Sequence, residues 1–361
     1  MNRKLQVAIS LVHGLGPVNT RNLISEVGGV EEVFGSSDKD LLKIPGITQK
    51  VISSLRGDYI LERADQELNF IEKNEVDVYF YTDKEFPRRL EFCADAPLLL
   101  FGKGNMNFNA KRVISIVGTR TSSQYGREMA EKIVEGLAEL DVLVISGLAL
   151  GIDISSHKAA VKNNLQTIGC LAHGIETIYP SSSRVTAGQM LKNGGVLTEF
   201  LSGTLPNREN FPNRNRVIAG MCDCLLVVES KNRGGSMISA DLAYGYNKDV
   251  FAIPGKATDK LSEGCNDLIK FKKGIMVTSG KDIAREMNWD LSKKSVQPQL
   301  FPELTSGQKI ALAAIRNASS IQIDELGLKT GIENSSLASI LLELEFEGLI
   351  RSLPGKIYET A

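Results

Sequence analysis

The stretch Val113-Ile-Ser-Ile-Val-Gly-Thr-Arg120 is typical of a buried β-strand that runs into a glycine turn. A polar stretch and an amphipathic helix from about Arg127 to Leu140 follow it. The next expected strand, Val142 to Ser146, ends in Gly147-Leu-Ala-Leu-Gly-Ile-Asp153, where another helix begins. Strands, glycine turns and helices that alternate in this way predict an α/β fold with a parallel sheet, whose binding crevice lies at the carboxyl ends of the strands.

A third glycine turn, Arg233-Gly-Gly-Ser-Met237, follows the expected strand Cys224 to Val228 and opens a helix that runs through Tyr246. None of the three turns has the G-x-G-x-x-G pattern of dinucleotide-binding proteins or the G-x-x-x-x-G-K-[ST] pattern of the phosphate loop. The sequence therefore disfavours both hydride transfer and nucleoside triphosphate hydrolysis.

The segment Arg208-Glu-Asn-Phe-Pro-Asn-Arg-Asn-Arg-Val-Ile-Ala-Gly220 places an aromatic residue, a proline and three arginines ahead of an apolar run. Phe211-Pro212 is typical of a loop that ends in the first turn of a helix, because proline lacks the N–H that would stay unbonded there. Helix N-termini and arginine side chains both favour phosphate, and an aromatic ring beside them can stack on an unpaired base. The alternative interpretation is a surface ion-pair cluster in which Phe211 packs against the helix.

A chain of 361 residues is long enough for two or three domains with their own cores. The five cysteines show no C-x-x-C spacing, so buried reduced thiols are favoured over zinc ligands or disulfides, and no metal site is expected. No signal-like apolar core and no apolar run of about 18 residues occurs, which predicts a cytoplasmic protein that does not contact the membrane.

The formal net charge of −1 is unevenly distributed. Residues 109–285 hold 22 Lys and Arg against 17 Asp and Glu, whereas residues 61–108 carry a net charge of −4. A basic middle flanked by acidic segments indicates that a polyanionic partner would bind the middle.

The pattern along the chain predicts five segments: a helical module over residues 1–60, an extension leading into the core over 61–108, the core over 109–285, a linker over 286–304, and a terminal module over 305–361. In the first module, Leu11-Val-His-Gly-Leu-Gly-Pro17 and Leu42-Lys-Ile-Pro-Gly-Ile-Thr48 each resemble a helix-hairpin-helix turn. Such a turn can serve as a structural or protein-binding module, or its N–H groups can contact a nucleic-acid phosphate. The polar, proline-containing pattern of the linker begins at about Ile283.

The terminal module has three stretches of apolar residues at helical spacing, followed by a hairpin pattern with its turn at Pro354-Gly355. Three helices and a hairpin predict a winged helix. The helix that would enter the DNA groove, Ser335 to Phe346, contains Glu343 and Glu345 and no basic residue. We therefore interpret this module as one that contacts protein.

The motifs quoted above, together with several others, closely resemble those of one family. The set comprises Gly118-Thr-Arg120, Gly147-Leu-Ala-x-Gly-Ile-Asp153, Tyr179-Pro180, Phe211-Pro-x-Arg-Asn-Arg-Val-Ile-Ala-Gly220, Gly234-Gly-Ser236, Val250-Phe-Ala-Ile-Pro-Gly255 and Ser262-x-Gly-Cys-Asn-x-Leu-Ile269. In this order they resemble the DNA-processing protein A family (DprA, also called Smf). The resemblance implies a Rossmann-like core that binds single-stranded DNA during natural transformation. It also implies a homodimer that loads the RecA recombinase onto the strand.

The resemblance implies that Arg120 holds a backbone phosphate, and that Arg214 and Arg216 line the same basic pocket. Phe211 would be either a stacking platform or a buried packing residue. The full set of predicted DNA-binding residues is Gly118, Thr119, Arg120, Gly147, Phe211, Asn213, Arg214, Asn215, Arg216, Gly235 and Ser236. Leu150 stands where many members have Lys or Arg, and Lys158, Lys231 and Arg233 are the residues that could compensate.

Catalysis has weaker support in the sequence. Asp153 and His157 stand four residues apart at a helix start, as an acid–base pair or, as we favour, as a cap and a structural hydrogen bond. His173 could face the crevice, but no nucleophile elbow surrounds Ser146 or Ser236. The rival prediction is a Rossmann-like enzyme that binds or cleaves nucleotides. The expected protein binds DNA, has no catalytic residue and uses no cofactor.

Overall fold

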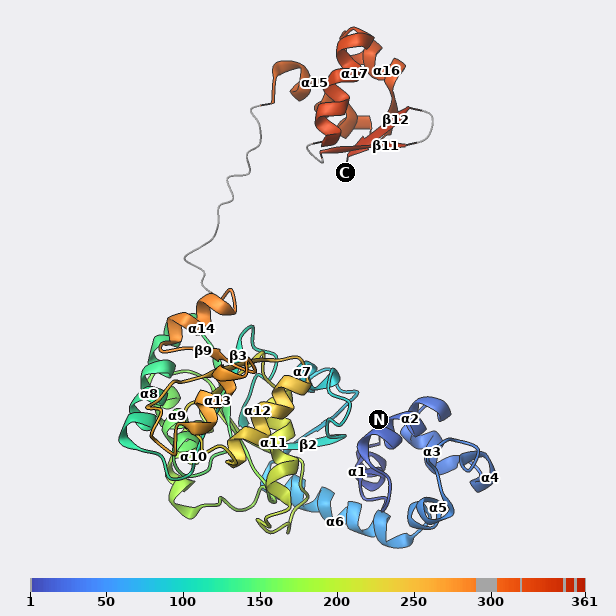
Figure 1. The fold of residues 1–361 in the computed structure, drawn as a ribbon. Helices are drawn as coiled ribbons and strands as arrows, with labels where there is room; N and C mark the ends of the chain where they lie inside the picture. Colours follow the sequence, from blue (N-terminus) through green and yellow to red (C-terminus); the bar gives the residue numbers. More distant parts are fainter. Residues whose placement is uncertain (1, 290–303, 319, 347–348, 354–355, 361) are drawn as a thin grey trace. The chain divides into compact units, whose positions relative to one another are not determined.

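The computed structural model describes residues 2–289, 304–318, 320–346, 349–353 and 356–360. The chain divides into two compact units, Met1–Asp290 and Leu291–Ala361 (Figure 1). Among the described residues, no helix combines the length and the apolar character that crossing a bilayer requires.

The first unit is built on a sheet of nine strands. β1 and β2 pair antiparallel, β2 and β6 pair antiparallel, and the other neighbours are parallel. In spatial order the strands are β1 (Asp77–Phe80), β2 (Leu99–Asn105), β6 (Gly194–Thr198), β5 (Thr167–Cys170), β4 (Leu143–Ser146), β3 (Val113–Val117), β7 (Cys224–Val227), β8 (Asp249–Ala252) and β9 (Ile275–Met276). The predicted α/β core with a parallel sheet is confirmed, and its strand order is Rossmann-like.

Helices cover both faces of the sheet. Alternation along β3 sends Ile114 and Ile116 to one face and Val113 and Val117 to the other. The first face packs against α8 (Gln124–Gly136), α9 (Ile152–Lys162) and α14 (Gly280–Glu286), and the second against α11 (Asn210–Gly220), α12 (Gly235–Gly245) and α13 (Glu263–Lys270). The remaining elements of the core are α7 (Arg88–Glu91), η1 (Ala138–Leu140), η2 (Ser181–Ser183) and α10 (Arg184–Met190). Burial of both faces explains why the central strands are almost wholly apolar.

One helix boundary agrees with the sequence prediction and another differs from it. Helix α11 begins at Asn210, so Pro212 lies inside its first turn, where a missing N–H costs nothing. Helix α14 continues through Glu286 and buries Ile283, the residue at which the linker pattern was expected to begin. Residues 290–303, which include most of that linker, lie outside the described residues.

Short helices form the N-terminal part of the first unit, as expected from the glycine turns. They are α1 (Arg3–Ser10), α2 (Pro17–Val27), α3 (Val30–Gly35), α4 (Asp38–Leu41) and α5 (Gln49–Leu55). A longer helix, α6 (Asp58–Asn74), follows them and packs against α1 (Figure 1). Arg21 on α2 donates a 2.7 Å hydrogen bond to the carbonyl of Ala96, which ties the helices to the loop before β2.

The second unit is a small α/β module with its own core. It contains α15 (Ser306–Ala318), β10 (Ser320–Gln322), α16 (Ile323–Thr330), α17 (Asn334–Phe346), β11 (Ile350–Leu353) and β12 (Ile357–Thr360). The strands form an antiparallel sheet in the order β10-β12-β11. Three helices and this sheet confirm the predicted winged helix, although the expected turn at Pro354-Gly355 lies outside the described residues.

Candidate functional site

The candidate site lies at the point where the strand order reverses. From β3 the chain proceeds outward through β4, β5 and β6, and it then returns to place β7 on the other side of β3. The loops that leave β3 and β7 therefore diverge to opposite faces at the carboxyl ends of the strands. In open α/β sheets a reversal of this kind creates the ligand crevice.

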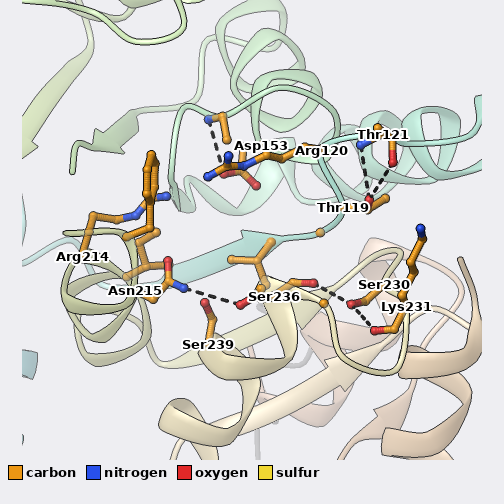
Figure 2. Close-up of a pocket in the computed structure, with 17 residues that line it drawn as sticks. Thr119, Arg120, Thr121, Asp153, Arg214, Asn215, Ser230, Lys231, Ser236 and Ser239 are labelled. Carbon is orange, nitrogen blue, oxygen red and sulfur yellow. Dashed lines mark hydrogen bonds between the residues drawn. The ribbon is translucent and has the colours of Figure 1, made fainter. Parts of the chain in front are cut away.

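A cavity of about 360 Å³ occupies this crevice. Figure 2 shows Arg120 and Asp153 on one side of it and Asn215, Ser236 and Ser239 on the other. Eight of the predicted DNA-binding residues line it: Gly118, Thr119, Arg120, Phe211, Arg214, Asn215, Gly235 and Ser236. The structure thus brings together three motifs that are widely separated in the sequence.

The loop after β3 is fixed by hydrogen bonds to the loop after β7. Thr119 donates its N–H to the carbonyl of Glu229 at 2.8 Å. The buried carboxylate of Glu229 accepts hydrogen bonds from Ser123, at 2.8 Å from the backbone N–H and at 2.6 Å from Oγ. Because these bonds cross the crevice floor, they hold the backbone beneath Arg120 in place without a ligand.

Arg120 is an exposed cation of the crevice. Its guanidinium lies 4.6 Å from the centre of the Phe211 ring, within the range of a cation–π contact. Phe211 itself is half-buried, on the first turn of α11. The ring therefore both packs in the crevice wall and orients the arginine.

Arg214, by contrast, is a buried residue that is 5% exposed. Its Nη1 donates to the carbonyls of Gly147, at 2.6 Å, and Cys170, at 2.7 Å. Burial raises the pKa of the neighbouring Asp153 carboxyl, and the positive charge of Arg214 opposes that shift. Arg214 thus joins α11 to the ends of β4 and β5 and contributes positive charge from beneath the surface.

Gly147 makes room for this arrangement. A Cβ atom at this position would lie 2.1 Å from Nη1 of Arg214 and 2.6 Å from Oδ2 of Asp153. A side chain there would have to displace the Arg214 guanidinium from its two carbonyl acceptors, which explains the glycine at the end of β4.

The N-terminus of α12 forms the opposite wall. Ser236 donates from Oγ to Oγ of Ser230 at 2.8 Å, and Ser230 in turn donates to the carbonyl of Lys231 at 2.9 Å (Figure 2). The first N–H groups of a helix have no acceptor within the helix and favour an anion. A Cβ atom on Gly235 would meet nothing within 4 Å, so the backbone is open to a ligand there.

Three predicted residues, Gly147, Asn213 and Arg216, do not line this cavity. Asn213 is exposed on α11. Arg216 pairs with the carboxylate of Glu199 and donates to the carbonyl of Asp95. Burial raises the pKa of Glu199 to about 7, and Arg216 acts in the opposite direction. Contact of either Asn213 or Arg216 with DNA stays a prediction.

Gly147 and Leu150 line a smaller neighbouring cavity of about 50 Å³, together with Arg120 and His173. Nδ1 of His173 lies 2.8 Å from the carbonyl oxygen of Gly174. Leu150 is exposed at the rim. The neighbouring cavity therefore has an apolar side chain at its rim.

In the structure, Asp153 and His157 do not pair with each other. Nδ1 of His157 lies 2.7 Å from Oγ1 of Thr167 on β5, whereas Asp153 faces Arg214. Burial lowers the pKa of His157 to about 3, so the ring is neutral at physiological pH. The geometry agrees with the structural role that we favoured for this histidine.

The sequence interpretation missed several contributors to the site. Ser230, Ser239, Thr121 and Ala149 line the cavity, and Glu229 organises it from below. One sequence feature could have indicated these residues. Glu229 and Ser230 directly follow a buried strand, at an edge where loops from neighbouring strands meet. Lys231, considered only as a compensating cation, also lines the cavity.

The fold and the crevice place the protein among Rossmann-like α/β proteins with a ligand site at the topological switch point. Residues 77–288, more than half of the chain, match the family model described as DNA recombination-mediator protein A, and residues 296–356 match that of the DprA winged helix domain. The chain therefore belongs to the DNA recombination-mediator protein A (DprA) family, and the resemblance inferred from the motifs is confirmed.

Similar proteins include the DNA processing protein DprA of Streptococcus pneumoniae, which is 39% identical over 207 residues, covering 57% of this chain and 73% of the relative. A solved structure of DprA from that organism superimposes with a TM-score of 0.65 at 32% identity, over 78% of this chain and 95% of the other. The structure of DNA processing protein A from Helicobacter pylori, solved to explain its single-stranded DNA binding mode, has a TM-score of 0.54 at 23% identity, over 59% of this chain and 96% of the other. The last similarity concerns the fold alone.

Proposed function

We propose that this protein binds single-stranded DNA in the crevice between the loops after β3 and β7. The observation that carries the proposal is the convergence of Arg120, Lys231 and the N-terminus of α12 on one cavity of about 360 Å³. An exposed guanidinium, an exposed ammonium and open backbone N–H groups are the donors that phosphate oxygens prefer.

Binding of this kind is electrostatic and independent of base sequence. Cations and backbone N–H groups contact the phosphates, and the release of counterions makes the affinity fall as salt rises. The cavity is at the small end of ligand pockets, which span about 300–1,000 Å³. A single nucleotide unit fits such a space, whereas a duplex does not.

The family supports a proposal for the role of the strand-binding site. We propose that the protein acts in natural transformation, where it protects incoming strands and loads the RecA recombinase onto them. The family description as a recombination mediator and the strand-binding structure of the Helicobacter pylori relative support this role.

The edge of the sheet supports a homodimer. β9 pairs with β8 on one side, and both of its residues, Ile275 and Met276, are exposed. Phe271, just before β9, is 65% exposed. An open strand edge with apolar neighbours is a surface on which a second copy can pair. A dimer would offer two crevices to one strand and so raise its avidity.

The test is the anisotropy of a labelled oligonucleotide, single- or double-stranded, titrated over a salt series. We expect salt-dependent binding of the single strand, and we expect Arg120→Ala to weaken it for every sequence and to lower the salt slope by about one unit. Arg285→Ala is the matched control, because Arg285 is 75% exposed on α14, on the face of the sheet away from α11 and α12. Equal binding by wild type and Arg120→Ala would overturn the assignment of the crevice. Nucleotide hydrolysis without strand binding would favour the rival enzyme.

A further inference from the structure

The outward face of α17, the helix that a winged helix normally inserts into DNA, has an ordered pattern of side chains. Ser335, Ser339, Leu342 and Phe346 are all exposed and are spaced at intervals of four, three and four residues. This spacing places them on one stripe of the helix. Phe346 is 86% exposed and Leu342 is 56% exposed, so the stripe has two bulky apolar residues at its C-terminal half and two small residues at its N-terminal half.

The stripe carries no charge. Glu343 accepts a 2.7 Å hydrogen bond from Gln308 of α15. Glu345 accepts from the N–H and the hydroxyl of Ser352 on β11, at 3.1 and 2.6 Å. Both carboxylates of the helix are therefore engaged within their own unit, to either side of the stripe. A surface of this kind offers nothing to a phosphate backbone, which requires cations.

The stripe is complementary to itself. When two copies of α17 run antiparallel about a two-fold axis, one register places Phe346 of each helix opposite Ser335 of the other. The same register places Leu342 opposite Ser339, because the midpoint between residues 335 and 346 is also the midpoint between residues 339 and 342. Bulky side chains then fill the spaces above small ones, as close helix packing requires. A two-fold axis also demands that one patch match itself.

We propose that α17 is a dimer contact, through which the winged-helix units of two copies of this chain pair in antiparallel orientation. The patch is small, since only two bulky residues per copy are covered, and a stable interface buries about 1,200–2,000 Å². The contact therefore acts within an assembly that another surface holds together, and it rests on the homodimer of the proposed function. Tethering raises the effective concentration of the two units to the millimolar range.

The register can be tested by disulfide trapping in the full-length chain, whose five native cysteines are all buried. In Ser335→Cys/Phe346→Cys, the two new thiols stand eleven residues apart on one helix, about 16 Å, too far for a bond within one copy. Between copies they face each other in the proposed register. We expect mild oxidation to yield a covalent dimer in the double variant and less than a tenth as much in either single variant. Adding Leu342→Asp to the double variant should abolish the covalent dimer.

Light scattering on the reduced protein separates the two proposals. If the reduced protein is a dimer in solution but the oxidised double variant forms no disulfide, the α17 contact is overturned and the homodimer stands. A monomer at every concentration would overturn both. Equal cross-linking in the single and double variants would also overturn the proposed register, because it would indicate random collision. If Leu342→Asp loses RecA loading and the double cysteine variant does not cross-link, the stripe binds another protein, and the α17 contact is overturned.

Discussion

At the scale of single residues, the two arginines of the site have different roles that their sequence context does not separate. Arg120 follows Thr119 and Arg214 follows Asn213, both in polar segments, and both were predicted to contact DNA. In the structure Arg120 is exposed above the Phe211 ring, whereas Arg214 is buried on two carbonyl groups. We therefore expect Arg120 to act on affinity and Arg214 to act mainly on the stability of the crevice.

Replacing Gly147 by alanine should damage both stability and binding. The added Cβ would overlap Arg214 and Asp153 at distances well under 3 Å, and overpacking of this kind costs about 1–3 kcal/mol. Thermal unfolding should show a lowered Tm, and the anisotropy titration should show weaker strand binding. Gly245→Ala is the matched control, because its Cβ would meet nothing within 4 Å and alanine favours the helix by about 0.5–1 kcal/mol. An unchanged Tm for Gly147→Ala would contradict the tight fit of Arg214.

His157 should make stability depend on pH. Its pKa is about 3 in the folded protein, below the value of roughly 6.5 in an unfolded chain. Between these values the unfolded state binds the proton and the folded state does not, so stability falls as the pH drops from about 6.5 towards 3. The loss approaches about 1.4 kcal/mol per pH unit.

The measurement is denaturant unfolding of wild type and His157→Gln between pH 7.5 and pH 5. We expect the advantage of wild type over the variant to shrink by roughly 2 kcal/mol over this range. A difference that stays constant with pH would show that His157 titrates normally in the folded state.

At the scale of elements, the strands and helices of the core could be predicted from the sequence because each carries a local signal. Buried parallel strands such as β3 and β7 are continuous apolar runs, and the glycine turns mark their ends. Pro212 lies in the first turn of α11, as the Phe211-Pro212 pattern predicted, because proline is tolerated at the positions of a first turn. The contribution of Glu229 could not be predicted, since its partners, Thr119 and Ser123, lie more than 100 residues away in sequence.

Glu229→Gln should loosen the loop after β3. The variant amide can keep an oxygen on the N–H of Ser123 and turn its N–H₂ group to the Ser123 hydroxyl, so what it loses is the negative charge of the acceptor, and a neutral hydrogen bond is roughly half as strong as a charge-assisted one. We expect faster amide hydrogen exchange in residues 119–123, unchanged exchange in β5, and several-fold weaker strand binding. Glu131→Gln, at an exposed position of α8, is the matched control. Unchanged amide hydrogen exchange in residues 119–123 would mean that Glu229 does not hold the loop after β3.

At the scale of the whole molecule, the crevice belongs entirely to the first unit, Met1–Asp290. A chain that ends at residue 290 should therefore bind a single strand with an affinity within about twofold of the full-length protein at equal salt. The anisotropy titration measures this directly, with far-ultraviolet circular dichroism to confirm that the shortened chain folds. A tenfold loss of affinity would place part of the strand contact in the winged-helix unit.

The order of the strands has a consequence for synthesis of the protein. The crevice needs β7 beside β3, and paired residues such as Ser115 and Leu225 are more than a hundred positions apart in sequence. Contacts between such distant segments form late, because a long loop must close first. On the ribosome, the chain can build β3 to β6 while β7 is still inside the exit tunnel, but it has no crevice at that stage. In the proposed function, only a polypeptide that has emerged past the first turn of α12 can hold a DNA strand, so strand binding during synthesis would report that β7 has joined the sheet beside β3.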